Sequence, residues 1–391
     1  MRASARLASP SRRSMLGLRP SRAARFLGLV LAACLTLLGF GVPHAASAHQ
    51  GPPPGSPTEF SWLPDHLRLD GAGLAWRVEY TSTSFDGTRN IVGGTITFPS
   101  GRPPAGGWPI AALLPGASGT AEQCAPSIAG NPPFATPLLE SLLAAGWAVA
   151  ETDYEGVSTP GPNPGIHGPS EAYSAIDLVR VAQHIGIASR TWAAVGYSQG
   201  GHGALHTSAL AADYAPELDH VGTIAIAPVT QLQLLLSAPA DDPGFPVNVF
   251  MPYFGAALAA THPGQYQPAD WFTPAGLALV AAAGERCTEQ MAAQTAALTN
   301  ADVFTDAPAA MAQMRELLAA QEIPTAGHTE PIRIVHGTTD GLPWQFTELT
   351  AAQLEGGGAD VEFVPLTGED HFSVLAAAEP MVLDWLAAFL E

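Results

Sequence analysis

Three side chains in the second half of the chain could together carry out nucleophilic acyl transfer. Ser198 lies in the sequence GYSQG, between an apolar run and a stretch with helical spacing. A serine hydroxyl becomes a nucleophile when a histidine takes its proton and a carboxylate orients that histidine. Asp340 and His371 follow Ser198 in the order serine, acid, histidine. This order and the G-x-S-x-G spacing predict a nucleophile elbow and a Ser198–Asp340–His371 triad.

Each of these residues also has an interpretation without chemistry. The chain contains 40 glycines among 391 residues, so a G-x-S-x-G can arise by chance. Asp340 lies in TTDG, a composition that is typical of turns. Glu369 and Asp370 are competing acids, although they adjoin His371 in sequence and would hardly reach its far nitrogen. His336 lies inside a predicted strand, where we expect it to fill or line the core.

His202 and His206 stand four residues apart on a predicted helix, which is the spacing of a metal-binding pair. Gly203 occupies the place of the glutamate in H-E-x-x-H, and no third ligand is evident. We therefore expect no metal, and a triad mechanism needs no organic cofactor either.

Acyl transfer also needs two backbone amides that hold the oxyanion. One is expected from Gln199, directly after the nucleophile, and the other from the loop that ends the apolar run 108–119. We assign the second donor to Ala117, with Gly116 as the next candidate. The alternative is that this loop is a plain glycine turn.

Strands and helices alternate around these residues. Short apolar or alternating runs predict strands at 73–84, 90–99, 108–119, 147–156, 191–197, 220–228, 331–337 and 360–366. Helical spacing predicts helices at 134–146, 170–186, 199–214, 343–357 and 380–391. This alternation indicates an α/β fold with a mostly parallel central sheet flanked by helices. The core would comprise residues 65–228 and 331–391, with each triad residue in a loop after its own strand.

Residues 229–330 interrupt this alternation, because they contain helical patterns only. We interpret them as a helical cap inserted after the sixth predicted strand. The segment is unusually apolar for an excursion from a sheet, which favours a lid over an apolar cleft. Ordinary helical packing without a gating role is the alternative.

The N-terminus has the pattern of an export signal. Seven arginines and no acid lie in residues 1–25, an apolar run covers 26–42, and Ala46-Ser47-Ala48 provides a small-residue cleavage site. Residues 1–48 are therefore predicted to be a secretory signal peptide, and 49–64 a linker rich in proline and glycine. A membrane anchor is one alternative, and lipoprotein anchoring at Cys34 is another.

Beyond the arginine-rich segment the chain carries nine basic and 35 acidic side chains, a net charge of −26. Such a surface repels phosphate backbones, so we expect no nucleic-acid partner. Cys124 and Cys287 remain after cleavage, and in an oxidising compartment an even pair predicts one disulfide. Two buried free thiols are the alternative. The sequence does not determine the oligomeric state.

Four stretches carry a resemblance to a known family: 119–127 (GTAEQCAPS), 152–183, 196–201 (GYSQGG) and 336–343 (HGTTDGLP). With them the chain resembles the α/β-hydrolase superfamily and, more narrowly, the secretory lipase family of fungi and actinobacteria. The resemblance spans roughly residues 60 to 390. It implies an extracellular triacylglycerol lipase or esterase whose triad is Ser198, Asp340 and His371.

The expected substrate is therefore a small-molecule or lipid ester, with transient contact at a lipid–water interface. One departure from the family pattern is Pro115, where a histidine often precedes the first glycine. A serine peptidase or an acyltransferase on the same fold is the first alternative, and a binding protein without activity is the second. The apolar insertion favours acyl chains over peptides.

Overall fold

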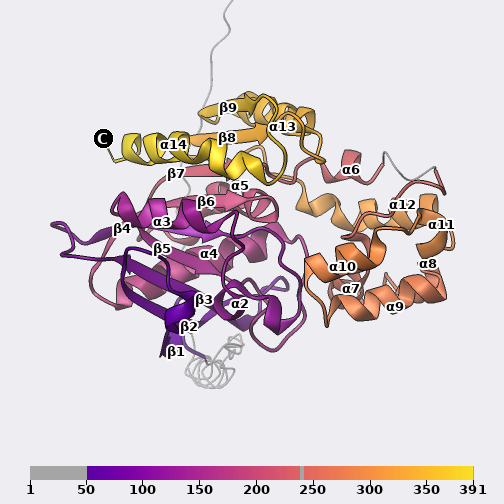
Figure 1. The fold of residues 1–391 in the computed structure, drawn as a ribbon, viewed down its shortest axis with the longest axis horizontal. Coiled ribbons are helices and arrows are strands. Elements are labelled where there is room, and N and C mark those ends of the chain that lie inside the picture. Colours follow the sequence, from indigo (N-terminus) through magenta and orange to yellow (C-terminus); the bar gives the residue numbers. More distant parts are fainter. Residues whose placement is uncertain (1–50, 238–241, 391) are drawn as a thin grey trace, which may run out of the picture. The chain divides into compact units, whose positions relative to one another are not determined.

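A nine-stranded sheet runs through the part of the chain that the computed structural model describes, residues 51–237 and 242–390 (Figure 1). Its order is β1-β2-β3-β5-β4-β6-β7-β8-β9. The pairs from β1 to β3 and the β3–β5 pair are antiparallel, and the remaining pairs are parallel. The strands are β1 (Pro57–Trp62), β2 (Ala72–Thr83), β3 (Arg89–Pro99), β4 (Trp108–Leu114), β5 (Ala148–Thr152), β6 (Ala188–Tyr197), β7 (Asp219–Ile226), β8 (Ile332–Gly337) and β9 (Val361–Leu366). The predicted signal peptide, with Cys34, lies outside the described residues.

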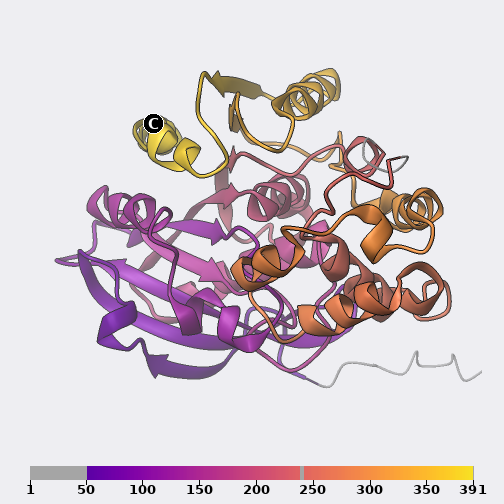
Figure 2. The ribbon, with the colours of Figure 1, turned by 45° about the vertical axis from the view of Figure 1, so that its right-hand side comes forward.

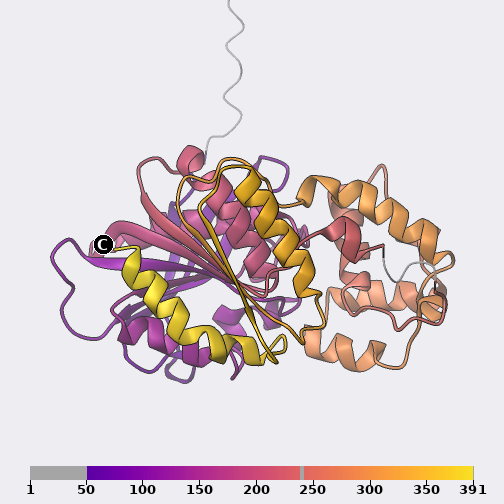
Figure 3. The ribbon, with the colours of Figure 1, turned by 90° about the horizontal axis from the view of Figure 1, so that it is seen from above.

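Helices cover both faces of the sheet (Figure 3). Leu139 and Val382 share one core cluster with Val195 of β6, whereas Ile176 packs in another cluster with Ala194. Because successive strand residues point to opposite faces, Val195 and Ala194 show that these helices lie on opposite sides. One face carries α3 (Thr136–Ala144) and α14 (Ser373–Ala388), and the other carries α4 (Gly168–His184), α5 (Gln199–Tyr214) and α13 (Trp344–Gly356). Three further elements are short, namely α2 (Pro126–Ala129) and the 3₁₀ turns η1 (Asp65–Leu67) and η2 (Glu122–Cys124). The predicted α/β fold with a mostly parallel sheet is confirmed.

The prediction of a linker over residues 49–64 is wrong for its second half. Pro57–Trp62 form β1, which pairs antiparallel with β2 and places Phe60 opposite Val78. The ring of Trp62 stacks on that of Trp76, with centroids 5.0 Å apart. An edge strand needs hydrogen bonds on one side only and tolerates proline at its first residue. The insertion consequently follows the seventh strand, β7, and not the sixth.

The inserted residues form helices with a core of their own. Between β7 and β8 the described residues contain α6 (Leu232–Leu235), α7 (Met251–Thr261), α8 (Pro268–Trp271), α9 (Pro274–Ala283), α10 (Thr288–Thr295), α11 (Asn300–Val303), α12 (Ala307–Leu318) and the turn η3 (Ala319–Gln321). Figure 2 shows them gathered beside the sheet. Phe272 and Phe304 are buried with ring centroids 4.9 Å apart, and Met291 and Met314 are fully buried in the same cluster. None of the helices in the described ranges is long and apolar enough to cross a membrane.

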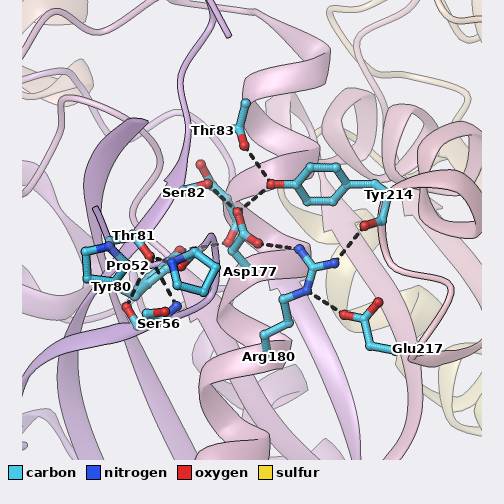
Figure 4. A network of polar contacts seen from close by, with 12 residues as sticks. Pro52, Ser56, Tyr80, Thr81, Ser82, Thr83, Asp177, Arg180, Tyr214 and Glu217 are labelled. Carbon is cyan, nitrogen blue, oxygen red and sulfur yellow. Dashed lines mark hydrogen bonds and ion pairs between the residues drawn. The ribbon is translucent and has the colours of Figure 1, made fainter. Parts of the chain in front are cut away.

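A buried polar network joins the antiparallel part of the sheet to α4 and α5 (Figure 4). Asp177, which is fully buried, accepts hydrogen bonds from Ser82 (2.7 Å), Arg180 (2.7 Å) and the hydroxyl of Tyr214 (2.9 Å). Burial raises the pKa of Asp177 to about 6, although these donors oppose the shift. Arg180 also donates to Glu217 at 2.7 Å. The charges of this network are thus paired and hydrogen-bonded, as buried charges must be.

A second buried carboxyl group, Glu151 on β5, has fewer hydrogen-bond donors around it. Its Oε2 accepts a hydrogen bond from Asn131 at 2.8 Å, whereas Oε1 has no partner within the described residues. Burial raises the pKa of Glu151 to about 8, helped by the nearby Asp153 and opposed by Asn131. Glu151 is therefore neutral in the folded protein at pH 7.

This burial makes stability depend on pH. The folded state keeps the Glu151 proton up to about pH 8, and the unfolded chain loses it near 4.5. The contribution to the free energy of unfolding is complete below pH 4.5 and is lost as the pH rises to about 8. We expect Glu151→Gln, which mimics the neutral acid, to exceed the wild type in unfolding free energy by roughly 4 kcal/mol at pH 8 and by about 1 kcal/mol at pH 5.

The measurement is urea unfolding of both proteins at pH 5, 6.5 and 8. Glu59→Gln on the exposed face of β1 is the matched control, because it removes one negative charge without altering a buried group. Unfolding free energies of the wild type and Glu151→Gln that change in parallel with pH would contradict the prediction.

Candidate active site

Ser198 lies on a strained turn between β6 and α5. Its φ of 57° and ψ of −116° are rare for a residue with a side chain. The turn depends on glycines: a Cβ on Gly196 would come within 1.9 Å of the Gly200 carbonyl oxygen, and a Cβ on Gly200 within 1.8 Å of the Leu114 carbonyl oxygen. The backbone amide of Ser198 donates to Ile226 on the neighbouring strand at 2.9 Å. The geometry is that of a nucleophile elbow.

The structure brings His371 between Ser198 and Asp340. His371 lies in the loop between β9 and α14, and Asp340 in the loop between β8 and α13. The Nε2 atom of His371 lies 2.9 Å from the Ser198 hydroxyl oxygen, and Nδ1 lies 2.7 Å from Oδ2 of Asp340. The hydroxyl of Tyr197 donates to the His371 carbonyl at 2.8 Å and holds this loop in place. The three predicted residues therefore meet at hydrogen-bonding distances.

The competing acids have other contacts. Oδ1 of Asp370 accepts hydrogen bonds from the amides of Phe372 and Ser373 at the start of α14, and these bonds lower its pKa. The carbonyl oxygen of Glu369 accepts from Thr339. Within the described residues Asp340 is the only carboxylate bonded to the His371 ring.

Asp340 is held from three sides. Its side chain is 1% exposed, and Oδ1 accepts a hydrogen bond from the amide of Leu342 at 2.8 Å. His336 Nε2 lies 3.1 Å from Oδ2, out of line with the ring N–H, so this contact is electrostatic and not a well-directed hydrogen bond. Burial alone would raise the pKa of Asp340, but the contacts with His336 and His371 outweigh it and lower the pKa. Asp340 is therefore a carboxylate at neutral pH.

His336 is fully buried in β8, where the sequence predicts a core or lining residue. Its contact with Asp340 was not predicted. The four-residue spacing across the turn is the one signal that could have indicated it.

Ala117 and Gly116 lie in the loop after β4, beside the cavity that contains Ser198. Thr288 of the insertion holds this loop, because its hydroxyl donates to the Ala117 carbonyl at 3.0 Å and its amide to the Ser118 carbonyl at 2.9 Å. Among the described residues, the amides of Ala117 and Gln199 have no hydrogen-bond acceptor. Both are thus available to an oxyanion, and they remain the proposed donors.

The sequence did not predict a buried hydrogen-bond network that lies beneath Gln199. The Gln199 side chain donates to Oε1 of Glu171 at 2.8 Å, and Oε2 of Glu171 lies 3.1 Å from Nδ1 of His202. Nε2 of His202 contacts the carbonyl oxygen of Gln321, at the end of the insertion, at 2.8 Å. A carbonyl can only accept, so Nε2 of His202 is the donor in this contact. The network links the nucleophile turn to the insertion.

His202 and His206 thus have hydrogen-bonding roles. Their rings are 4.6 Å apart, and Nε2 of each faces the Gln321 carbonyl oxygen. Burial lowers the pKa of His206 well below its usual value, and the neighbouring His202 adds to this effect. No group of three or more metal-ligating side chains forms among the residues that the structure describes.

The predicted disulfide between Cys124 and Cys287 is present and confirms the pairing. It joins the segment after β4 to the N-terminus of α10. Hydrogen bonds run along the same seam, from Thr120 to the Ala283 carbonyl (2.7 Å) and from Gln123 to the Glu285 carbonyl (2.7 Å). The insertion is therefore fastened to the loop that contains Ala117.

A cavity of about 490 Å³ opens at Ser198 and His371. The insertion contributes mainly apolar side chains to its lining, namely Val229, Leu235, Leu236, Pro246, Phe250, Met251, Phe254 and Met311. A cavity lined mainly by apolar side chains, with some polar groups among them, is typical of a site for a largely apolar ligand.

The fold is that of α/β-hydrolase esterases and lipases. The structure is similar to the rice cell wall degrading esterase LipA from Xanthomonas oryzae, with a TM-score of 0.71 and 20% identity, covering 87% of this chain and 99% of that one. Candida antarctica lipase A in its closed state is also similar, with a TM-score of 0.65 and 21% identity over 82% of this chain and 78% of that one. At these identities the likeness establishes the fold.

The family is narrower than the fold. The secretory lipase family model matches residues 134–391, and the chain belongs to this family. A Mycobacterium tuberculosis protein named "Probable inactive lipase MT1628" is 27% identical over 277 residues, 64% of this chain and 56% of that protein. Lipase 7 of Candida albicans is 30% identical over 118 residues, 29% of this chain and 27% of that protein. The chain thus matches about half of the first relative and less of the second.

Proposed function

We propose that this chain is a secreted serine hydrolase that cleaves carboxylic esters through an acyl-enzyme, as a lipase or carboxylesterase. The observation that carries the proposal is the position of His371, which lies 2.9 Å from the Ser198 hydroxyl and 2.7 Å from Asp340. Membership of the secretory lipase family supports ester hydrolysis. The Cys124–Cys287 disulfide is consistent with an extracellular protein.

In the proposed reaction His371 takes the proton of Ser198 as the hydroxyl oxygen attacks the ester carbonyl. Asp340 orients the imidazole and stabilises its positive charge, which fits a carboxylate with a lowered pKa. The amides of Gln199 and Ala117 hold the oxyanion, and the N-terminus of α5 adds its positive end. His371 then protonates the leaving alcohol, and water hydrolyses the acyl-enzyme with the same histidine as base.

The apolar lining from the insertion supports an acyl chain as the group bound there. Eight apolar side chains of the insertion line the cavity, and a hydrocarbon chain gains about 0.8 kcal/mol for each CH₂ group that it buries. This lining fits an ester of a lipid or another small apolar acid better than a peptide. We infer that residues 229–330 act as a cap over this cavity.

A second candidate function is ligand binding without catalysis. It is favoured by the name of the mycobacterial relative, a probable inactive lipase. Against it stand the contacts of Ser198, His371 and Asp340, because a hydrolase that has lost activity usually lacks a member of this set.

The test is labelling with a fluorophosphonate probe, followed by hydrolysis of p-nitrophenyl esters from C2 to C16. We expect the probe to label the wild type at Ser198 and the rate to peak at medium or long chains, because the cap lines the cavity with apolar side chains. A peak at C2 to C4 would identify an esterase for small esters. An unlabelled protein that nevertheless binds fatty acids would establish the binding function instead.

A further inference from the structure

Two aromatic rings, Tyr197 and Phe372, contact the ring of His371, and a third, Phe134, contacts both of them. Phe134 precedes α3, Tyr197 ends β6, and Phe372 follows His371 directly. We call these three residues the aromatic rim. The ring of Phe134 lies 5.1 Å from that of Phe372 and 6.1 Å from that of Tyr197, and the Tyr197 ring lies 5.1 Å from His371. The rim therefore consists of rings in mutual contact from three separate elements.

Two of these rings are exposed to solvent although they are large and apolar. Phe372 is 56% exposed and Phe134 is 38% exposed, although an apolar side chain normally gains free energy when it is buried. Phe372 also lines the cavity that contains Ser198. The rim is thus an unfilled apolar surface that is continuous with the candidate active site.

The chemistry of ester cleavage determines which part of a substrate meets the rim. When the tetrahedral intermediate collapses, the bond between the acyl carbon and the alcohol oxygen breaks, and His371 passes its Nε2 proton to that oxygen. The alcohol oxygen must therefore lie within hydrogen-bonding distance of His371. The rest of the alcohol is then next to His371, where Phe372 lines the cavity, whereas the acyl carbon is bonded to Ser198.

We propose that the aromatic rim is the binding site for the alcohol part of the substrate, and that it selects esters of neutral aromatic alcohols. This inference rests on the proposed ester hydrolase function. The rings of Phe134 and Phe372 are inclined by 67°, an edge-to-face arrangement to which a further aromatic ring can be added favourably. Asp370 also lines the cavity beside Phe372, and its lowered pKa keeps it negative. An anionic alcohol part is consequently repelled.

The test compares butyrate esters of benzyl alcohol, cyclohexylmethanol and ethanol at concentrations where all are dissolved monomers. The measured quantity is kcat/KM, because it reports formation of the acyl-enzyme, and the butyryl-enzyme is the same for all three. We expect the wild type to prefer the benzyl ester over the cyclohexylmethyl ester. In Phe372→Ala the ratio of benzyl to ethyl kcat/KM should fall by about tenfold, and in Phe134→Ala by about threefold.

Phe372→Leu keeps an apolar side chain without a ring and should remove the preference for benzyl over cyclohexylmethyl. Phe60→Ala is the matched control, since Phe60 is 42% exposed on β1 and does not line the cavity. It should leave every ratio unchanged.

Two results would overturn the proposal. Ratios that are equal in the wild type and in Phe372→Ala would show that the rim does not contact the alcohol. If Phe372→Ala lost activity only on emulsified tributyrin, with unchanged kcat/KM ratios for the monomeric esters, the rim would be a contact for a lipid surface. Failure of the underlying ester hydrolase function is distinguishable, because then the wild type would cleave none of the three esters.

Discussion

Replacing Ser198 with alanine is expected to lower kcat for p-nitrophenyl butyrate by about 10⁴-fold or more, as in other enzymes that depend on a serine nucleophile. The reason is that the acyl-enzyme cannot form, while the oxyanion donors and the cavity remain. The measurement is the steady-state rate with freshly purified protein, corrected for the uncatalysed reaction. A Ser198→Ala protein that kept its full activity would exclude Ser198 as the nucleophile.

The fold should survive this change. Alanine keeps the Cβ of serine, so the strain at φ 57° is the same in both proteins, and the backbone amide of residue 198 still donates to Ile226. Ser198→Gly would instead relieve the strain, because glycine adopts positive φ without cost. We expect Ser198→Ala to unfold in urea at nearly the wild-type midpoint. A large decrease would mean that its loss of activity reports unfolding.

Asp340→Asn tests whether Asp340 acts by orienting the ring of His371 or merely by lying next to it. Asparagine fits the same space, but it can present an amide N–H to Nδ1 of His371 and thereby favour the wrong tautomer. We expect kcat to fall by about 10⁴-fold with little change in KM, as in other triads. Asp370→Asn is the control at neutral pH, because Asp370 has no contact with the His371 ring within the described residues.

The proximity of Ser198, Asp340 and His371 could be predicted because parallel strands end at one edge of a sheet. Ser198, Asp340 and His371 each follow a strand, so a correct prediction of β6, β8 and β9 places their loops together. The disulfide was predictable for a different reason, since only two cysteines lie beyond the predicted signal peptide. Neither inference required knowledge of a long-range contact.

The elements that the sequence did not indicate depend on contacts between residues far apart in the sequence. β1 lies in a segment rich in proline and glycine, and it becomes a strand because β2 offers a free edge. The final helix begins at Ser373 and not at Pro380, which lies in its interior. Proline is typical of the first turn of a helix, so Pro380 misplaced this boundary.

The same limit applies to the residues around the triad. A turn separates His336 from Asp340, whereas 31 positions separate Glu171 from His202 and 171 positions separate Thr288 from Ala117. Nothing in the local sequence of Glu171 or Thr288 specifies a partner. The contact of Thr288 depends on the way the insertion packs on the loop after β4, and that of Glu171 on the way α4 packs on α5.

The attachment of the insertion leads to the second large expected effect. Removal of the disulfide in a Cys124→Ala/Cys287→Ala variant should lower the free energy of unfolding by about 2–5 kcal/mol, because the bond closes a loop with a sequence separation of 163 residues. Urea unfolding monitored by tryptophan fluorescence measures this change. A variant as stable as the wild type would show that the hydrogen bonds of the seam suffice.

The disulfide should also affect catalysis, because Cys287 precedes Thr288, whose side chain and amide hold the carbonyls of Ala117 and Ser118. Once the bond is absent, α10 can move away, and the proposed oxyanion donor at Ala117 loses its fixed position. We expect kcat to fall by about tenfold at temperatures where the variant is folded, with a smaller effect on KM, since an oxyanion contact acts mainly in the transition state. Thr288→Val separates the two effects, because it removes the hydroxyl bond to Ala117 and leaves the disulfide intact. It should lower kcat with little loss of stability, whereas an unchanged kcat in both variants would show that Ala117 does not hold the oxyanion.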